Sequence, residues 1–109
     1  MNESILLAFC TCPDEVVAER LAETLVREGL AACTNLLPGL RSLYSWEGQI
    51  QRDAETLLLI KTVASRYPEL EARLSELHPY HLPEIIAVPV SHGLPDYLKW
   101  VIACTSPLS

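Results

Sequence analysis

The sequence predicts one α+β domain over residues 1–109, with the ferredoxin-like split βαβ fold and an antiparallel sheet. Two observations predict this fold. Apolar runs of strand length alternate with amphipathic stretches at helical spacing, in the order βαββαβ followed by a terminal helix. The first and third predicted strands are continuously apolar, as central strands are, whereas the second and fourth contain a proline, as edge strands do.

The first predicted strand covers residues 5–10, whose continuous apolar run is typical of a strand that is buried on both faces. Residues 11–14 then predict a helix start, with Thr11 as the hydroxyl cap and Pro13 in the first turn. An apolar stripe at helical spacing follows. Gly29 predicts the end of this helix, because glycine commonly follows the last helical turn.

The second predicted strand is long and broken. Residues 31–37 and 40–46 both show a β pattern, and Pro38-Gly39 between them predicts a bulge or bend. Residues 47–49 indicate a hairpin turn. After a polar return, residues 56–63 form the third predicted strand, with a largely apolar core.

A second helix is predicted around the apolar stripe from Tyr67 to Leu77. His78-Pro79 ends it, because proline disfavours helix in the residue that precedes it. The fourth predicted strand covers residues 84–90, and Pro89 places the end of this strand at a sheet edge. Pro95 then starts a short terminal helix.

The charge balance excludes several classes of partner. Fourteen Asp and Glu residues outnumber eight Lys and Arg residues, the net charge is −6, and no basic run occurs, so no nucleic-acid partner is expected. No apolar stretch is long enough for a membrane span, and residues 1–4 lack the basic start of a signal peptide. We therefore expect a protein without membrane insertion that is cytoplasmic, or else has already lost an export signal, and whose four cysteines are free thiols.

Half of the residues are hydrophobic, which is more apolar surface than a lone domain of this size easily hides. The excess lies on the predicted edge strands and on the terminal helix, and includes Tyr44, Trp46 and Trp100. The period of two places Tyr44 and Trp46 on one side of their strand, where exposed aromatic pairs are typical of interfaces. We therefore expect self-association to bury these residues.

Cys10 and Cys12 lie two residues apart, where the first strand runs into a helix start. The partial positive charge of a helix N-terminus lowers the pKa of a thiol, so the pair suits a soft metal ion or a redox site. The alternative is that both are small packing residues. Cys33 and Cys104 lie in apolar sequence and are expected to be buried, so a four-ligand structural zinc site is not expected.

His78 and His81 lie in one loop that two prolines stiffen, an arrangement that suits a divalent metal or an anionic small ligand. Alternatively, His78 complements the dipole at a helix C-terminus and Tyr80 packs beside it. Lys61 and Glu84 adjoin buried strands. They would line a cleft between subunits and bind an anion and a cation respectively, or else form an ion pair.

The sequence contains no phosphate-binding loop, hydrolase triad or zinc-protease helix, so we expect no catalytic residues, no enzymatic activity and no organic cofactor. Thiol catalysis by Cys10 or Cys12 with His78 as base is a third, remote alternative.

A series of short blocks resembles the CutA family of divalent-cation tolerance proteins over nearly the whole chain. The blocks are CTCPDE at 10–15, GLAAC at 29–33, LPG at 37–39, SLYSWEG at 42–48, IKT at 60–62, HPY at 78–80 and PEII at 83–86. The resemblance implies a homotrimer of ferredoxin-like subunits, similar in architecture to the PII signalling proteins. It also implies a metal role for Cys10 and His78, although family members commonly have one cysteine before the first helix and this chain has two.

Two functions follow from this resemblance. In the first, a trimer involved in the response to metal ions, copper above zinc, binds a divalent cation or a small effector at clefts between subunits. Cys10 and His78 would bind the metal, and Cys12, Lys61, Tyr80, His81 and Glu84 would line the effector cleft. In the second, the trimer is a scaffold that anchors an unidentified protein partner and has only an indirect link to metals.

Overall fold

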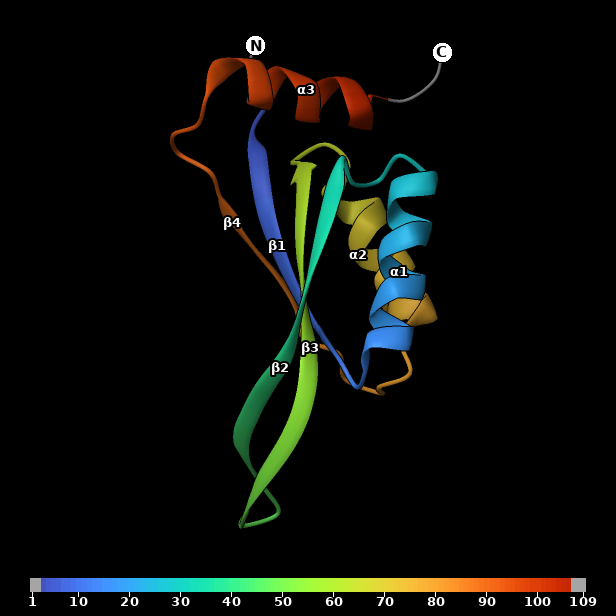
Figure 1. Cartoon of the computed structure of the whole chain (residues 1–109), viewed down its shortest axis with the longest axis vertical. Helices are drawn as coiled ribbons and strands as arrows, with labels where there is room; N and C mark the ends of the chain where they lie inside the picture. The colour runs from blue at the N-terminus through green and yellow to red at the C-terminus, as the bar shows by residue number, and fades with distance from the viewer. Residues whose placement is uncertain (1–2, 107–109) are drawn as a thin grey trace.

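The computed structural model describes residues 3–106 (Figure 1). The ends of the predicted domain, residues 1–2 and 107–109, lie outside this range. The elements in chain order are β1 (Ile5–Cys12), α1 (Glu15–Arg27), β2 (Cys33–Trp46), β3 (Gln49–Val63), α2 (Tyr67–Leu77), β4 (Ile85–Pro89) and α3 (Pro95–Thr105). This order confirms the predicted βαββαβ arrangement with a terminal helix.

The four strands form one antiparallel sheet in the order β2-β3-β1-β4. The two strands with continuous apolar cores, β1 and β3, are central, and the two that contain proline are at the edges, as predicted. Pro89 is the last residue of β4 and pairs with Leu6 of β1. Since proline has no N–H to donate, it is tolerated at this position.

The start of α1 differs from the prediction. Thr11 and Cys12 do not begin the helix but continue β1, where they pair with β3. The N-cap is Asp14, whose side chain accepts a hydrogen bond of 2.8 Å from the Val17 amide. Aspartate caps a helix at least as well as threonine, and the longer strand gives Thr11 and Cys12 ladder partners on β3.

Gly29 ends α1, as predicted, with a φ of 70° that favours glycine. The Leu30 amide donates to the Leu25 carbonyl oxygen at 2.9 Å, and the Gly29 amide donates to the Val26 carbonyl oxygen at 3.1 Å. These two bonds form a Schellman motif, which satisfies the last carbonyl groups of the helix. The chain then turns directly into β2.

The β2–β3 hairpin extends well beyond the part of the sheet that the helices cover (Figure 1). Its register shifts between Leu37 and Leu40, which confirms the predicted bulge. Glu47 and Gly48 form the connecting turn, with φ values of 50° and 77° that are typical of a tight hairpin turn. β3 begins at Gln49 rather than at residue 56. The polar residues before 56, which the sequence predicts as a return between strands, instead form a ladder with the outer half of β2.

α1 and α2 cover one face of the sheet, and the main core lies between them and the strands (Figure 1). Its buried members include Ala8, Cys10 and Cys12 of β1, Leu58 and Ile60 of β3, Ala18, Leu21 and Leu25 of α1, and Leu70 and Leu74 of α2. These residues recur every second position in the strands and at helical spacing in the helices, as their sequence pattern requires.

The opposite face of the sheet, here called the open face, is covered by neither α1 nor α2, and α3 lies only across its end (Figure 1). Leu37, Ile86 and Val88 on this face are 49%, 55% and 44% exposed. Leu7 and Phe9, which β1 presents to this face, are only partly buried, so the expectation that the first strand is buried on both faces is wrong for a single chain. Exposed apolar patches of this kind are typical of protein interfaces.

α3 lies across the end of the sheet where β1 begins (Figure 1). Val101 is buried there against Ile5 and Val63, in a second, smaller core. Tyr97 and Trp100 remain 41% and 46% exposed, and their ring centroids are 5.6 Å apart. Over residues 3–106, no helix is long and apolar enough to cross a membrane.

Candidate functional site

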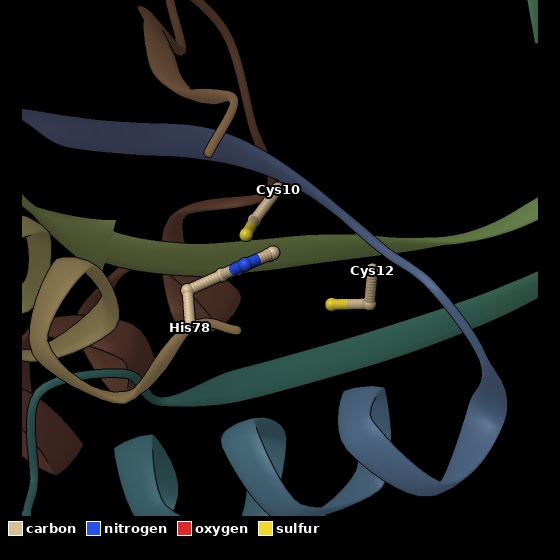
Figure 2. Close-up of side chains that lie close together, drawn as sticks. All are labelled: Cys10, Cys12 and His78. Carbon is tan, nitrogen blue, oxygen red and sulfur yellow. The ribbon is translucent and has the colours of Figure 1, made fainter. Parts of the chain in front are cut away.

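Cys10, Cys12 and His78 form one buried cluster. One ligand atom from each, the two Sγ atoms and a ring nitrogen, all lie within 4.8 Å of one another. Figure 2 shows the three side chains pointing toward one another, the two cysteines from β1 and the histidine from the loop after α2. This brings together both residues for which the sequence implied a metal role, and adds Cys12, which was expected in an effector cleft.

The fold positions each member of this cluster. Because side chains alternate along a strand, Cys10 and Cys12 share the helix-covered face of β1, and both are 0% exposed. His78 is the C-cap residue of α2, and its amide donates to the Leu74 carbonyl oxygen at 2.8 Å. Pro79, the next residue, prevents the helix from continuing, so the imidazole stays at the end of α2.

Both nitrogens of the His78 ring are already hydrogen-bonded. Nε2 donates to the Thr11 carbonyl oxygen at 2.8 Å, and Nδ1 accepts from the Tyr80 amide at 3.1 Å. A carbonyl oxygen only accepts and an amide N–H only donates, so the ring is the neutral tautomer with its proton on Nε2. The Tyr80 ring packs beside the imidazole, with 4.8 Å between the two ring centroids.

The two thiols influence each other's ionisation. The hydrogen bond to Cys12, followed by burial, raises the pKa of Cys10 well above its ordinary value. The same bond from Cys10 lowers the pKa of Cys12. Cys12 is therefore the thiol of the pair that ionises first, with Cys10 as the donor that stabilises its thiolate.

The donor set of the cluster decides which metal ions fit. Two thiolates are ligands for soft ions, and the Sγ atoms have only weak partners: each other, and the Thr11 carbonyl oxygen at 3.9 Å from the Cys10 thiol. His78 fits less well, because it binds a metal only after giving up its bond to Thr11 or to Tyr80. The thiol pair is thus the part of the cluster ready to hold an ion.

A separate acidic groove of about 820 Å³ lies between the β2–β3 hairpin and the loop after α2. Its lining residues are Thr11, Tyr44, Trp46, Gln51, Asp53, Glu55, Pro79, Tyr80, His81, Leu82 and Glu84. Three carboxylates and three aromatic side chains are the main features of this surface. Such a surface suits a cation, because carboxylates attract positive charge and aromatic faces favour it.

Two tyrosines hold two of the three carboxylates of the groove, Glu55 and Asp53. The Tyr80 hydroxyl donates to Glu55 at 2.8 Å, and the Tyr44 hydroxyl donates to Asp53 at 2.6 Å. Burial and the bond to Glu55 raise the pKa of Tyr80 above its ordinary value, and the bond to Asp53 raises the pKa of Tyr44. Both phenols therefore stay protonated as donors at physiological pH.

The groove collects some of the residues expected in an effector cleft and excludes others. Tyr80, His81 and Glu84 line it. Lys61 does not: it lies on the open face of β3, and its ammonium group donates to the Asn35 side chain. The alternative ion pair between Lys61 and Glu84 is therefore wrong for this chain.

The aromatic residues expected at an interface occupy two places. Tyr44 and Trp46 line the groove from β2, on one side of the strand as predicted, and Trp100 lies on α3. None of the four cysteines forms a disulfide in the structure. Cys104, however, is exposed and Cys33 only half-buried, because their apolar neighbours, and not the cysteines, face the small core under α3.

The acidic residues Asp53 and Glu55 of β3 lie outside the strand that the sequence predicts at 56–63. The expected polar return holds Gln51, Arg52 and Asp53, and no role is expected for Glu55, although Gln51, Asp53 and Glu55 alternate with a period of two. That alternation is the signal of a strand with one polar face, and it places all three side chains on the groove.

Comparison with known proteins identifies the family. The chain matches the family model described as CutA1 divalent ion tolerance protein over residues 6–104. The divalent-cation tolerance protein CutA of Thermus thermophilus is 46% identical over 101 residues, covering 93% of this chain and 95% of that protein. Protein CutA of Mus musculus is 45% identical over 106 residues, or 97% of this chain, and this chain spans 60% of the mouse protein.

Solved structures agree with the sequence matches. CutA from Xylella fastidiosa has a TM-score of 0.92 at 49% identity, covering 94% of this chain and 98% of that chain. A CutA from Archaeoglobus fulgidus, described as a periplasmic divalent cation tolerance protein, has a TM-score of 0.91 at 31% identity over 94% of this chain and 99% of that chain. The chain therefore belongs to the CutA1 divalent ion tolerance protein family.

Proposed function

We propose that this protein contributes to tolerance of divalent metal ions, copper in the first place, by binding a metal ion at the cluster of Cys10, Cys12 and His78. The observation that supports this function is the convergence of two thiols and one imidazole within 4.8 Å. Soft donors of this kind select copper or zinc over magnesium or calcium. The names of the relatives, divalent-cation tolerance proteins, point to the same class of ion.

The protein would act as a homotrimer. Its open face carries exposed apolar side chains, among them Leu37, Ile86 and Val88, which contact with other copies would remove from water. The acidic groove would then lie beside a neighbouring subunit and bind a small cationic effector through Glu84 and the carboxylates of β3. Nothing in this arrangement requires catalysis, so we propose that the protein is not an enzyme.

The free state of all four cysteines supports a reducing compartment, and we propose a cytoplasmic location. A scaffold function is the second candidate. It is favoured by Tyr97 and Trp100, two neighbouring and exposed aromatic rings on α3, because aromatic residues of this kind anchor protein interfaces.

Calorimetric titration of the reduced protein with zinc(II) and copper(II) tests metal binding. We expect a saturating heat that is lost in Cys10→Ser and reduced in His78→Ala. Cys104→Ser is the matched control, since Cys104 is a thiol outside the cluster. If the wild type and the Cys10→Ser variant give the same heat, the metal function is wrong.

The scaffold alternative has a different signature. The wild type would capture a protein partner, and Trp100→Ala would lose that partner while its metal affinity stays unchanged. This result would favour the scaffold function over metal binding.

A further inference from the structure

We propose that the acidic groove binds a linear aliphatic diamine, a molecule whose two ammonium groups are joined by a short methylene chain. One ammonium group pairs with Glu55 and the other with Asp53, and the chain that joins them lies against Tyr44 and Trp46. This inference rests on the cationic effector proposed above for the groove and specifies its chemical class. It does not depend on the metal ion proposed for the cysteine cluster.

Glu55 is a buried carboxylate that lines the groove without a positive partner. It is only 8% exposed, and the Tyr80 hydroxyl, a neutral donor, binds its Oε2 at 2.8 Å. Within residues 3–106, its other oxygen accepts no hydrogen bond and no lysine or arginine forms a salt bridge with it. Burying a carboxylate is costly unless a cation pairs with it. A ligand that brings a positive charge to Glu55 removes this cost.

The side chains that line the groove repel anions. Three of them are carboxylates, Asp53, Glu55 and Glu84, and none is a lysine or an arginine. The two arginines of the hairpin project from its opposite face, because Arg52 alternates with the groove residues of β3 and Arg41 pairs with Ala54. Since like charges disfavour binding and opposite charges favour it, the ligand of this groove is a cation.

The spacing of the carboxylates favours an organic cation over a metal ion. Asp53 and Glu55 are two residues apart on β3, a separation of about 7 Å along the strand. Different tyrosines hold them, Tyr44 at 2.6 Å from Asp53 and Tyr80 at 2.8 Å from Glu55. Magnesium and calcium need about six or more oxygen ligands around one point. Over residues 3–106, the cysteine–histidine cluster is the one group of three such side chains whose ligand atoms converge.

Two separated carboxylates suit two separated ammonium groups. An ammonium group is a compact charge with three N–H donors, so each one pairs with a single carboxylate. Tyr44 and Trp46, which are 44% and 59% exposed, give the groove an aromatic wall beside Asp53. Aromatic faces attract cations and shield methylene groups from water. A diamine, with charged ends and an apolar middle, matches both features.

The experiment is an NMR titration of the wild-type protein with putrescine, a diamine that has a four-carbon chain. The protein has two tryptophans, so two indole N–H signals are expected, and Trp100→Phe assigns them. The Trp46 signal should shift and saturate, because Trp46 lines the groove, whereas the signal of Trp100 on α3 should not move. This measurement on the wild type does not depend on whether any binding-site variant folds.

Variants test the assignment of the two charges. Glu55→Gln removes a buried charge and should weaken putrescine binding by about 10- to 100-fold, whereas Asp53→Asn removes an exposed one and should weaken it by about 2- to 5-fold. Trp46→Ala should weaken it by about 2- to 5-fold. Glu19→Gln is the matched control, because Glu19 is an exposed carboxylate on α1, and it should leave the affinity unchanged.

Butylamine, which has the same chain and a single ammonium group, separates the two ends of the groove. It should bind about 2- to 5-fold more weakly than putrescine, because it lacks the pair with Asp53. Glu55→Gln should weaken its binding as it does for putrescine, and Asp53→Asn should have no effect on it. An equal loss for both amines in Asp53→Asn would overturn the assignment of the second ammonium group.

The outcomes separate this inference from the proposed function. If calcium or magnesium shifts the Trp46 signal and putrescine does not, the inference is wrong and a cationic effector stands. If none of the three shifts it, both the diamine and the cationic effector are wrong. Putrescine binding that is unchanged in Glu55→Gln also overturns the inference. Putrescine binding that requires Glu55, in a protein that gives no calorimetric heat with zinc(II) or copper(II), supports the inference and overturns the metal function.

Discussion

The His78 imidazole donates a hydrogen bond of 2.8 Å from Nε2 to the carbonyl oxygen of Thr11, the residue between the two cysteines of the cluster. This bond joins the loop after α2 to the end of β1. Both partners are 7% exposed, so water cannot readily replace it. Since Thr11 and Tyr80 also line the acidic groove, the same imidazole connects the cluster with the groove.

His78→Ala should therefore destabilise the fold. It removes the bond to Thr11 and the acceptor of the Tyr80 amide, and leaving a buried polar group without a partner costs about 1–3 kcal/mol. Urea unfolding at a fixed protein concentration measures the loss. His81→Ala is the control, because His81 is exposed in the same loop. Equal stabilities of the two variants would show that the His78 bonds contribute little.

Tyr80 is expected to give the protein an alkaline limit. Burial and the bond to Glu55 raise the pKa of its phenol, so the native state keeps a proton that the unfolded state has lost. The stabilisation is full below the ordinary tyrosine pKa of 10.0 and disappears as the pH rises through the higher native value. Stability should fall as the pH rises above 10.0, and less steeply in Tyr80→Phe.

Tyr80→Phe should also lower the stability of the protein at neutral pH. Glu55 is 8% exposed, and Tyr80→Phe removes its 2.8 Å donor, which should cost about 1–3 kcal/mol. An ultraviolet absorbance titration of tyrosinate checks the assignment of the phenol, with Tyr97→Phe as the exposed counterpart. If the tyrosinate absorbance of the wild type and of Tyr80→Phe rises identically in the alkaline range, the raised pKa of the Tyr80 phenol is contradicted.

The fold could be predicted from the sequence because each element carries its own local signal. The apolar cores of β1 and β3 identify the central strands, Pro38-Gly39 marks the bulge, and Gly29 and His78-Pro79 end the two helices. These signals depend on the residue and its near neighbours, so one chain is sufficient to interpret them.

The site was harder to predict, because it depends on pairings between distant segments. Cys10 and Cys12 were recognised as a candidate pair from their spacing, but the bond from His78 to Thr11 depends on how α2 ends over β1. The start of β3 was missed for the same reason. Residues 49–55 are polar on their own and become a strand through pairing with β2.

The open face gives a prediction about assembly. Ile86 is an edge-strand residue that is 55% exposed in one chain, so Ile86→Lys should leave the fold of the subunit intact and prevent other copies from covering this face. Sedimentation should show the wild type as a trimer and the variant as a monomer. Val16→Lys is the matched control, because Val16 is 74% exposed on α1, on the other side of the sheet. A variant that sediments like the wild type would exclude this face as the interface.

Glu28 and Arg73 connect the two helices that cover the cluster, and they give an acid limit. The Arg73 guanidinium binds both carboxylate oxygens of Glu28, with Nε at 2.9 Å and Nη2 at 2.8 Å, and its Nη1 binds Glu76 at 2.7 Å. The bond to Arg73 lowers the pKa of Glu28 below its ordinary value of 4.5. The unfolded chain therefore takes up a proton at Glu28 before the native state does. The stabilisation is full above 4.5 and is lost as the pH falls through the native value.

Glu28→Gln should lower the thermal midpoint near neutral pH, and the midpoints of variant and wild type should converge at acid pH, where the wild-type carboxyl is protonated as well. Glu23→Gln is the control, because Glu23 pairs with Arg27 on the exposed side of α1 and such pairs contribute little. A difference between wild type and Glu28→Gln that persists unchanged in acid would mean that the amide disturbs packing at the end of α1. In that case the stabilisation would come from packing, and the ion pair of Glu28 with Arg73 would not contribute to holding α1 and α2 together.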